Sequence, residues 1–156
     1  RLGSTPLPRW GLIAAKTATV LAIEVAQTVL LVLIAVIFFG WRPAGSIPLA
    51  LLVMLIGTAA FAGLGMLMAG TLRAEATLAA ANGLFILFLA IGGVVLPTSH
   101  LPAVIQWLAQ ILPAAALSDA LRTALSPTGI SGGSLLLLTV WAVVLLVAAA
   151  LTFKWE

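Results

Sequence analysis

The sequence predicts an all-α protein, a polytopic bundle of membrane-spanning helices. Of its 156 residues, 63% are hydrophobic and only 7% are charged, whereas a soluble domain carries about a quarter charged residues. Four apolar runs each come close to the ~20 residues with which a helix crosses about 30 Å of hydrocarbon. Isolated strands would leave backbone groups unpaired in lipid, and the runs lack the period-two alternation of barrel strands. We therefore expect four helical spans.

The first three spans follow one another through short connections. A basic segment, residues 1–16, precedes the first span, and a short cytoplasmic tail, residues 154–156, follows the last. The stretches GWRPAGSIP and TLRAEAT join the first three spans, and the former is rich in the Gly and Pro that mark turns. The single transmembrane domain, residues 17–153, has its predicted spans at 17–39, 47–70, 76–96 and 134–153.

The connection between the third and fourth spans, residues 97–126, is longer and stays apolar. Pro97 ends the third span, because the residue before a proline avoids the helical region. A short helix follows with Pro102 in its first turn, where a missing N–H costs nothing. Pro113 separates it from a second short helix, Ala114 to Leu125. Neither can cross a bilayer, so we expect a re-entrant helical hairpin in the outer leaflet; the alternative is an amphipathic lid lying flat on the membrane.

Three side chains of this hairpin are candidates for a functional role. Trp107 lies near a predicted membrane interface, where Trp is enriched. Asp119 and Arg122 are three residues apart on the second short helix, so they can form an ion pair on its surface. Such a surface pair contributes under about 1 kcal/mol. The alternative is that the pair takes part in the entry or release of a substrate.

The basic residues indicate the orientation of the chain in the membrane. Five of the seven fall on one side of the predicted topology and two on the other, and the positive-inside rule puts the side with five in the cytoplasm. The five are Arg1, Arg9, Lys16, Arg73 and Lys154, and the two are Arg42 and Arg122. Both ends of the chain are therefore expected in the cytoplasm.

One ionisable side chain, Glu24, lies inside a predicted span. A charged group there costs on the order of 3 kcal/mol on insertion scales, so it should face protein or water. Gln27 and Thr28 follow at i+3 and i+4, on the same face of the helix. This polar stripe either lines a substrate path or forms an interhelical hydrogen-bond cluster that stabilises packing.

The sequence offers little for catalysis or cofactor binding. It has no Cys and only one His, which leaves too few ligands of the usual kinds for a metal. No GxxxxGK[ST] nucleotide loop occurs, and a lone Glu without an acid partner does not make a hydrolytic site. We expect no cofactor in this chain, no catalysis by it and no nucleic-acid partner.

An ordered set of motifs resembles the transmembrane permease subunit of type-2 ATP-binding-cassette (ABC) exporters. That family has a basic G-T-P-L-x-R segment before its third span, where this chain has LGSTPLPRWGLIAAK. Its fourth span ends in A-R-T-E, where this chain has GLGMLMAGTLRAEA. Its fifth span and the helices after it are similar to NGLFILFLAIGGVVLPTSHLPAVIQWLAQILP and the following SDALR. Gly92 stands where the family commonly has Ser, which we expect to be an exchange of one small residue for another.

The resemblance runs over nearly the whole chain and implies a function. It identifies the chain as the C-terminal two-thirds of such a permease, from the third span to the sixth. It implies a multi-pass plasma-membrane protein, in contact with lipid, that pairs with a second copy or a sister permease. A cytoplasmic subunit would bind ATP and Mg²⁺ and drive export of an amphipathic, lipid-like, drug or glycan substrate.

The same resemblance places the contact with the ATPase at the beginning of the chain. It lies at and just upstream of Arg1 to Thr5, which includes Gly3, and the basic segment continues to Arg9. The alternative for this segment is that its charges serve orientation alone. The alternative for the whole chain is a membrane anchor or assembly subunit that transports nothing.

Overall fold

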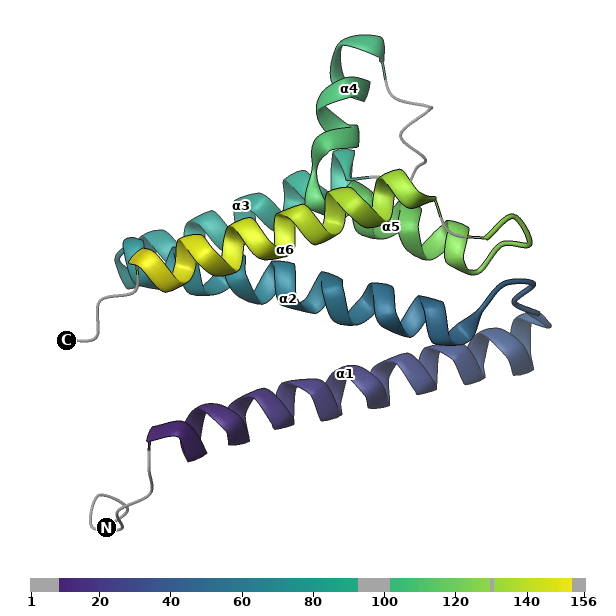
Figure 1. The fold of residues 1–156 in the computed structure, drawn as a ribbon, viewed down its shortest axis with the longest axis horizontal. Helices are drawn as coiled ribbons and strands as arrows, with labels where there is room; N and C mark the ends of the chain where they lie inside the picture. The colour runs from purple at the N-terminus through teal and green to yellow at the C-terminus, as the bar shows by residue number, and fades with distance from the viewer. Residues whose placement is uncertain (1–8, 93–101, 130, 153–156) are drawn as a thin grey trace. The chain divides into compact units, whose positions relative to one another are not determined.

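The computed structural model describes residues 9–92, 102–129 and 131–152, and this part of the chain is helical without a strand (Figure 1). Its helices are α1 (Arg9–Phe39), α2 (Ile47–Thr71), α3 (Ala74–Ile91), α4 (Ala103–Ile111), α5 (Pro113–Ala124) and α6 (Gly132–Thr152). Four of them are long and apolar enough to cross a membrane, over Ala18–Phe39, Ile47–Thr71, Ala74–Ile91 and Gly132–Thr152. The predicted all-α, four-span fold class is confirmed.

The chain divides into two compact units, residues 1–42 and residues 43–156. The described part of the first unit is α1 with the residues after it. Its helix begins at Arg9 and runs without a break to Phe39, so it takes in part of the segment predicted to precede the first span. The second unit contains α2 to α6.

Helix α2 is bounded at both ends by residues with extended backbone conformations. Ser46 is the N-cap, and its hydroxyl oxygen accepts a hydrogen bond of 3.4 Å from the backbone N–H of Leu49, the usual role of Ser at this position. At the other end, Leu72 and Arg73 adopt extended backbone conformations. Helix α3 then starts with Glu75 in its first turn, where an anion is favoured by the helix dipole.

The core of the second unit lies where α2, α5 and α6 pack together, and it consists mostly of alanine. Its fully buried larger side chains in the described residues are Val53 of α2 and Leu138 of α6. Small residues let helix backbones approach closely, which matters in a membrane because lipid tails are as apolar as leucine. The buried cluster is Ala50, Val53, Ala60, Ala116, Ala120, Ala124, Leu138 and Ala142.

Helix α3 is attached more loosely to this core. No residue of Ala74–Ile91 is buried. The half-buried residues form one stripe along the helix, at Thr77, Ala80, Leu84, Phe88 and Ile91. Phe88 meets Phe61 of α2 edge-on, with ring centroids 5.8 Å apart. The third predicted span, 76–96, extends past this helix into residues outside the described part of the chain.

Gly92, at the end of α3, has no room for a side chain. A Cβ atom there would lie 2.8 Å from the Cβ of Ala114 and would collide with the carbonyl oxygen of Phe88. The exchange from the Ser common in the resembling family is therefore not neutral here, because only Gly lets α5 approach the end of α3 this closely.

Candidate functional site: the α4–α5 pair and the helices that hold it

The two short helices are separated by a single extended residue. Helix α4 ends at Ile111, Leu112 has φ −66° and ψ 143°, and Pro113 is the first residue of α5. Proline causes this break, since it forces the preceding residue out of the helical region. The predicted break at Pro113 is therefore present. Pro102, expected in the first turn of α4, is instead its N-cap residue.

Helix α5 is bound to its neighbours through a face of alanines. Ala116, Ala120 and Ala124 recur every four residues and are buried in the core, which is the spacing of one helix face. On an adjacent side, Leu117 fits over Gly57 of α2, where an added Cβ would lie 2.7 Å from the Leu117 Cδ1. Both contacts depend on small residues, so α5 cannot shift without a clash or a gap.

Backbone hydrogen bonds hold the C-terminal end of α5 to the start of α2. The N–H of Gly45 donates to the carbonyl oxygen of Leu125 at 3.1 Å, and the N–H of Ser46 donates to that of Ala124 at 2.9 Å. A Cβ at Gly45 would collide with the Ala124 carbonyl oxygen. Glycine is therefore needed for this junction to close.

A tryptophan holds the other end, at the break between α4 and α5. The indole Nε1–H of Trp141, on α6, donates to the carbonyl oxygen of Ile111 at 2.8 Å. The last carbonyls of a helix have no partner within the helix, so this bond satisfies one that would otherwise face an apolar environment. The C-terminal end of α5 is thus tied to the start of α2, and the last residue of α4 is tied to α6.

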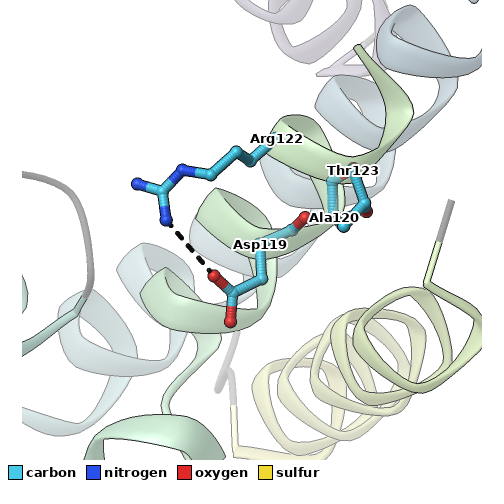
Figure 2. A network of polar contacts seen from close by, with 4 residues as sticks. All are labelled: Asp119, Ala120, Arg122 and Thr123. Atoms are coloured by element: carbon cyan, nitrogen blue, oxygen red, sulfur yellow. Dashed lines mark hydrogen bonds and ion pairs between the residues drawn. The ribbon is translucent and has the colours of Figure 1, made fainter. Parts of the chain in front are cut away.

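The polar side chains of α5 gather near its C-terminal half (Figure 2). Asp119 Oδ1 and Arg122 Nη1 are 3.6 Å apart, with side-chain exposures of 36% and 50%. Thr123 donates its hydroxyl to the carbonyl oxygen of Asp119 at 2.8 Å and accepts from the backbone N–H of Ser131 at 3.1 Å. The predicted ion pair is present and lies on the surface, whereas the threonine ties α5 to the residue before α6.

Helix α4 presents large apolar side chains outward. Trp107 is 60% exposed, and Leu108 and Ile111 are 46% and 48% exposed. Gln106 and Gln110 share one face at i and i+4, and Ala109 is buried. This surface is suited to lipid or to an apolar partner, because water would meet several large side chains at once.

An apolar groove of about 210 Å³ lies where α2, α3 and α5 meet. Phe61 and Phe88 form part of its wall, and Ser118 supplies a hydroxyl. The lining residues are Phe61, Phe85, Phe88, Leu89, Ala114, Leu117 and Ser118. Such a groove can hold an alkyl chain or a ring, with one polar group beside it.

The remaining predicted residues lie in the first unit or outside the described residues. Helix α1 carries Glu24, Gln27 and Thr28 on one face, and their role stays a prediction. Arg9 is the first residue of α1. The residues Arg1, Gly3, Thr5 and Pro97 lie outside the described part of the chain.

The sequence analysis did not single out Asn82. It lies midway along α3 and is exposed, as are Glu75, Ala79, Ile86 and Leu89. A helical projection of the third span would have found it, because apart from Glu75 in the first turn it is the polar residue on this side of the helix.

Comparison with known proteins gives one match. The family model described as ABC-2 type transporter matches residues 1–126. These residues include α1 to α5, so both the long helices that lead to the α4–α5 pair and the pair itself belong to the matched region. Neither a curated protein nor a solved structure matches the chain.

Proposed function

The chain belongs to the ABC-2 type transporter family, and from this premise we propose that it is the permease subunit of an ABC exporter. It would move an amphipathic, lipid-like, drug or glycan substrate outward across the plasma membrane. ATP would be hydrolysed, with Mg²⁺, by a separate cytoplasmic subunit. The observation that carries the proposal is the family match, which extends from the first span through the α4–α5 pair.

The architecture supports a permease rather than an anchor. An anchor needs only helices that stay in the membrane, and a lone span suffices for that. Here the C-terminal end of α5 is hydrogen-bonded to the residues that begin α2, and the last residue of α4 is hydrogen-bonded to α6. Membrane regions with short, broken helices occur where they are buried in protein or line a pathway. We therefore assign the α4–α5 pair to the outer part of the substrate route.

The apolar surfaces favour an amphipathic cargo. The groove between α2, α3 and α5 is lined by aromatic and aliphatic side chains with Ser118 as its polar group. Trp107 on α4 is also exposed. An acyl chain or a polycyclic drug can use both surfaces, whereas a large sugar would find few hydrogen-bond partners in the groove.

We assign coupling to the basic segment at the start of the chain. Pro6 and Pro8 stiffen it, because each proline fixes its own φ angle. A stiff segment can pass a displacement from the ATPase to α1. Arg1, Gly3, Thr5 and Arg9 would make or support that contact, and both chain ends would then lie in the cytoplasm.

The first test is purification in mild detergent together with an ATPase assay. We expect an ATP-binding subunit to co-purify and its ATP hydrolysis to rise with substrate. In Arg1→Glu and Gly3→Trp variants the complex should assemble, but the substrate should no longer stimulate hydrolysis. An intact complex with normal stimulation in both variants rejects the segment as the coupling element, and a chain that never binds an ATPase favours the anchor.

The second test is orientation. Because the chain has no Cys, single cysteines report without background. Cysteine at Ser46 or Ser131 should react with an impermeant thiol reagent from outside the cell, and cysteine at Ala74 should not. Labelling of Ala74→Cys but not of Ser46→Cys would reverse the proposed topology.

A further inference from the structure

The apolar groove between α2, α3 and α5 continues along α5 toward a pair of charges. Ala114, Leu117 and Ser118 are the residues of α5 in its wall. Arg122 follows Ser118 at i+4, on the same face of the helix, and it pairs with Asp119 at 3.6 Å. Both charged side chains project from the same side of α5 (Figure 2). This side of α5 therefore leads from an apolar wall, past a hydroxyl, to two opposite charges.

The contacts of α5 with α2 show how deep this arrangement lies in the membrane. Helix α2 is long and apolar enough to cross a bilayer and starts at Ile47, so its start marks a membrane interface. The N–H of Ser46 donates to the carbonyl oxygen of Ala124, and further along α2 Gly57 lies against Leu117. Helix α5 therefore runs from that interface into the membrane alongside α2, with its C-terminal end outermost.

The charged pair and the groove then lie at different depths. At 1.5 Å per residue, Arg122 is about 3 Å along the helix axis from Ala124, Ser118 about 9 Å and Ala114 about 15 Å. The hydrocarbon core of a bilayer is about 30 Å thick, with headgroups on either side. The pair is thus close to the headgroups, whereas the groove is at the depth of the acyl chains. A molecule that fills both places has a charged end and an apolar chain below it.

We propose that the groove and the Asp119–Arg122 pair form one binding site for a membrane phospholipid whose headgroup carries a phosphate and a primary amine. The lipid comes from the surrounding leaflet. One acyl chain occupies the groove, the phosphate accepts hydrogen bonds from the Arg122 guanidinium, and the ammonium donates to the Asp119 carboxylate. The site requires only that the chain spans a membrane, so the inference does not rest on export.

Charge complementarity selects this headgroup. A guanidinium recognises phosphate, so Arg122 alone would favour any anionic lipid. Asp119 lies 3.6 Å from it, and a carboxylate beside a second anion is unfavourable. A headgroup with both charges matches both side chains, which are 36% and 50% exposed and so within reach of lipid. A primary ammonium also brings N–H donors for the carboxylate, which the quaternary ammonium of choline lacks.

The groove selects the chain. It has a volume of about 210 Å³, and the rings of Phe61, Phe85 and Phe88 form much of its wall. Ser118 supplies a hydroxyl between the groove and the charged pair, where the ester carbonyl of a phospholipid can accept a hydrogen bond from it. A polycyclic drug can enter the same groove, but it offers no pair of opposite charges to Asp119 and Arg122.

Native mass spectrometry of the purified full-length protein in mixed lipid micelles tests the headgroup. Phosphatidylethanolamine should bind about tenfold more tightly than phosphatidylglycerol, because only the latter leaves Asp119 beside an uncompensated anion. Asp119→Asn should remove this preference by strengthening the binding of phosphatidylglycerol, and Arg122→Gln should weaken the binding of both lipids. Arg73→Gln and Glu75→Gln, which change exposed charges at the start of α3, are the matched controls and should have no effect. Equal binding of the two lipids, or an unchanged preference in Asp119→Asn, overturns the proposal.

Photo-cross-linking in native membranes tests the groove. Phe85 lines it and is 65% exposed, so benzoylphenylalanine at this position should form adducts enriched in phosphatidylethanolamine. The same replacement at Trp107, exposed on α4, samples the surrounding lipid and should give adducts in the proportions of the whole membrane. The same lipid proportions at both positions, or an adduct from Phe85 to protein instead of lipid, overturns the proposal.

The two proposals for this protein fail separately. A co-purified ATPase that is stimulated by substrate, together with no lipid preference, rejects the phospholipid site and leaves the exporter standing. A lipid preference that depends on Asp119, in a chain that never binds an ATPase, supports the site and rejects the exporter.

Discussion

Helices α2 and α3 are consecutive, similarly apolar and joined by a short turn, yet they are packed very differently. Helix α2 has five buried residues and α3 has none. The buried ones on α2 are Ala50, Val53, Gly57, Ala60 and Gly63. They are small and lie on one side, whereas α3 meets its neighbours through the larger Leu84 and Phe88. In lipid, hydrophobicity alone does not drive helices together, so the size of the facing residues decides which helix is buried.

The largest expected effect comes from filling the tight face of α2. A Cβ at Gly63 would lie 2.9 Å from the backbone nitrogen of Leu146, and a backbone cannot turn aside as a side chain can. Gly63→Leu should therefore lower the free energy of unfolding by about 3 kcal/mol or more. Thermal unfolding in detergent measures this. Gly65→Leu is the matched control, since an added Cβ there meets nothing within 4 Å. Equal losses in the two variants would contradict the packing argument.

A smaller effect is expected where α3 meets α2. Phe88 is half-buried and packs edge-on against Phe61. Phe88→Ala should cost about 1–2 kcal/mol, below the 3–5 kcal/mol typical of a fully buried Phe. Ile86→Ala, whose side chain is 65% exposed, should change the unfolding temperature little. If Ile86→Ala were the more harmful change, α3 would be held chiefly by its outward side, and the comparison with α2 would have to be reversed.

The next smaller effect on stability is expected at the break between α4 and α5. Trp141→Phe keeps an aromatic ring but removes the hydrogen bond to the Ile111 carbonyl oxygen, which should cost roughly 1 kcal/mol. The loss should appear together with faster hydrogen exchange around Leu112, because the bond holds the break. Trp107→Phe is the control, since Trp107 is 60% exposed. If hydrogen exchange around Leu112 were unchanged in Trp141→Phe, the alanine packing of α5 would be sufficient to hold the break between α4 and α5.

The smallest effect is expected at the ion pair on α5. Asp119 and Arg122 are substantially exposed, and exposed pairs contribute a few tenths of a kcal/mol after solvent screening. Asp119→Asn should leave stability within error, and a double-mutant cycle with Arg122→Gln should give a coupling energy near zero. A transport defect at normal stability would assign the pair to the substrate route. A large loss of stability would show that α5 depends on charge as well as on alanine.

Much of this fold followed from local patterns. The four spans follow from apolar runs near the length of a bilayer crossing, and the break before α5 follows from Pro113, which acts on the residue beside it. The ion pair on α5 follows from a spacing of three residues on a helix. Each of these signals depends on neighbours in the sequence, so no knowledge of packing was needed.

Other features depended on residues far apart in the chain. The sequence did not reveal that Trp141 bonds to the carbonyl of Ile111, that Gly45 and Ser46 bond to the end of α5, or that Gly92 must leave room for Ala114. The start of α1 at Arg9 and the place of Pro102 at the N-cap of α4 also differed from the predicted boundaries.

The sequence by itself determined that this protein is a helical membrane protein with four spans and two short helices between the last two. Composition and proline placement suffice for that, because lipid tolerates few backbone structures. Only the tertiary structure decided which face of each span packs against the other helices. Both α2 and α3 are apolar enough to cross a membrane, so hydrophobicity does not decide which of them is buried. The close approach of helix backbones does decide it, because it places Gly63 of α2 directly against α6.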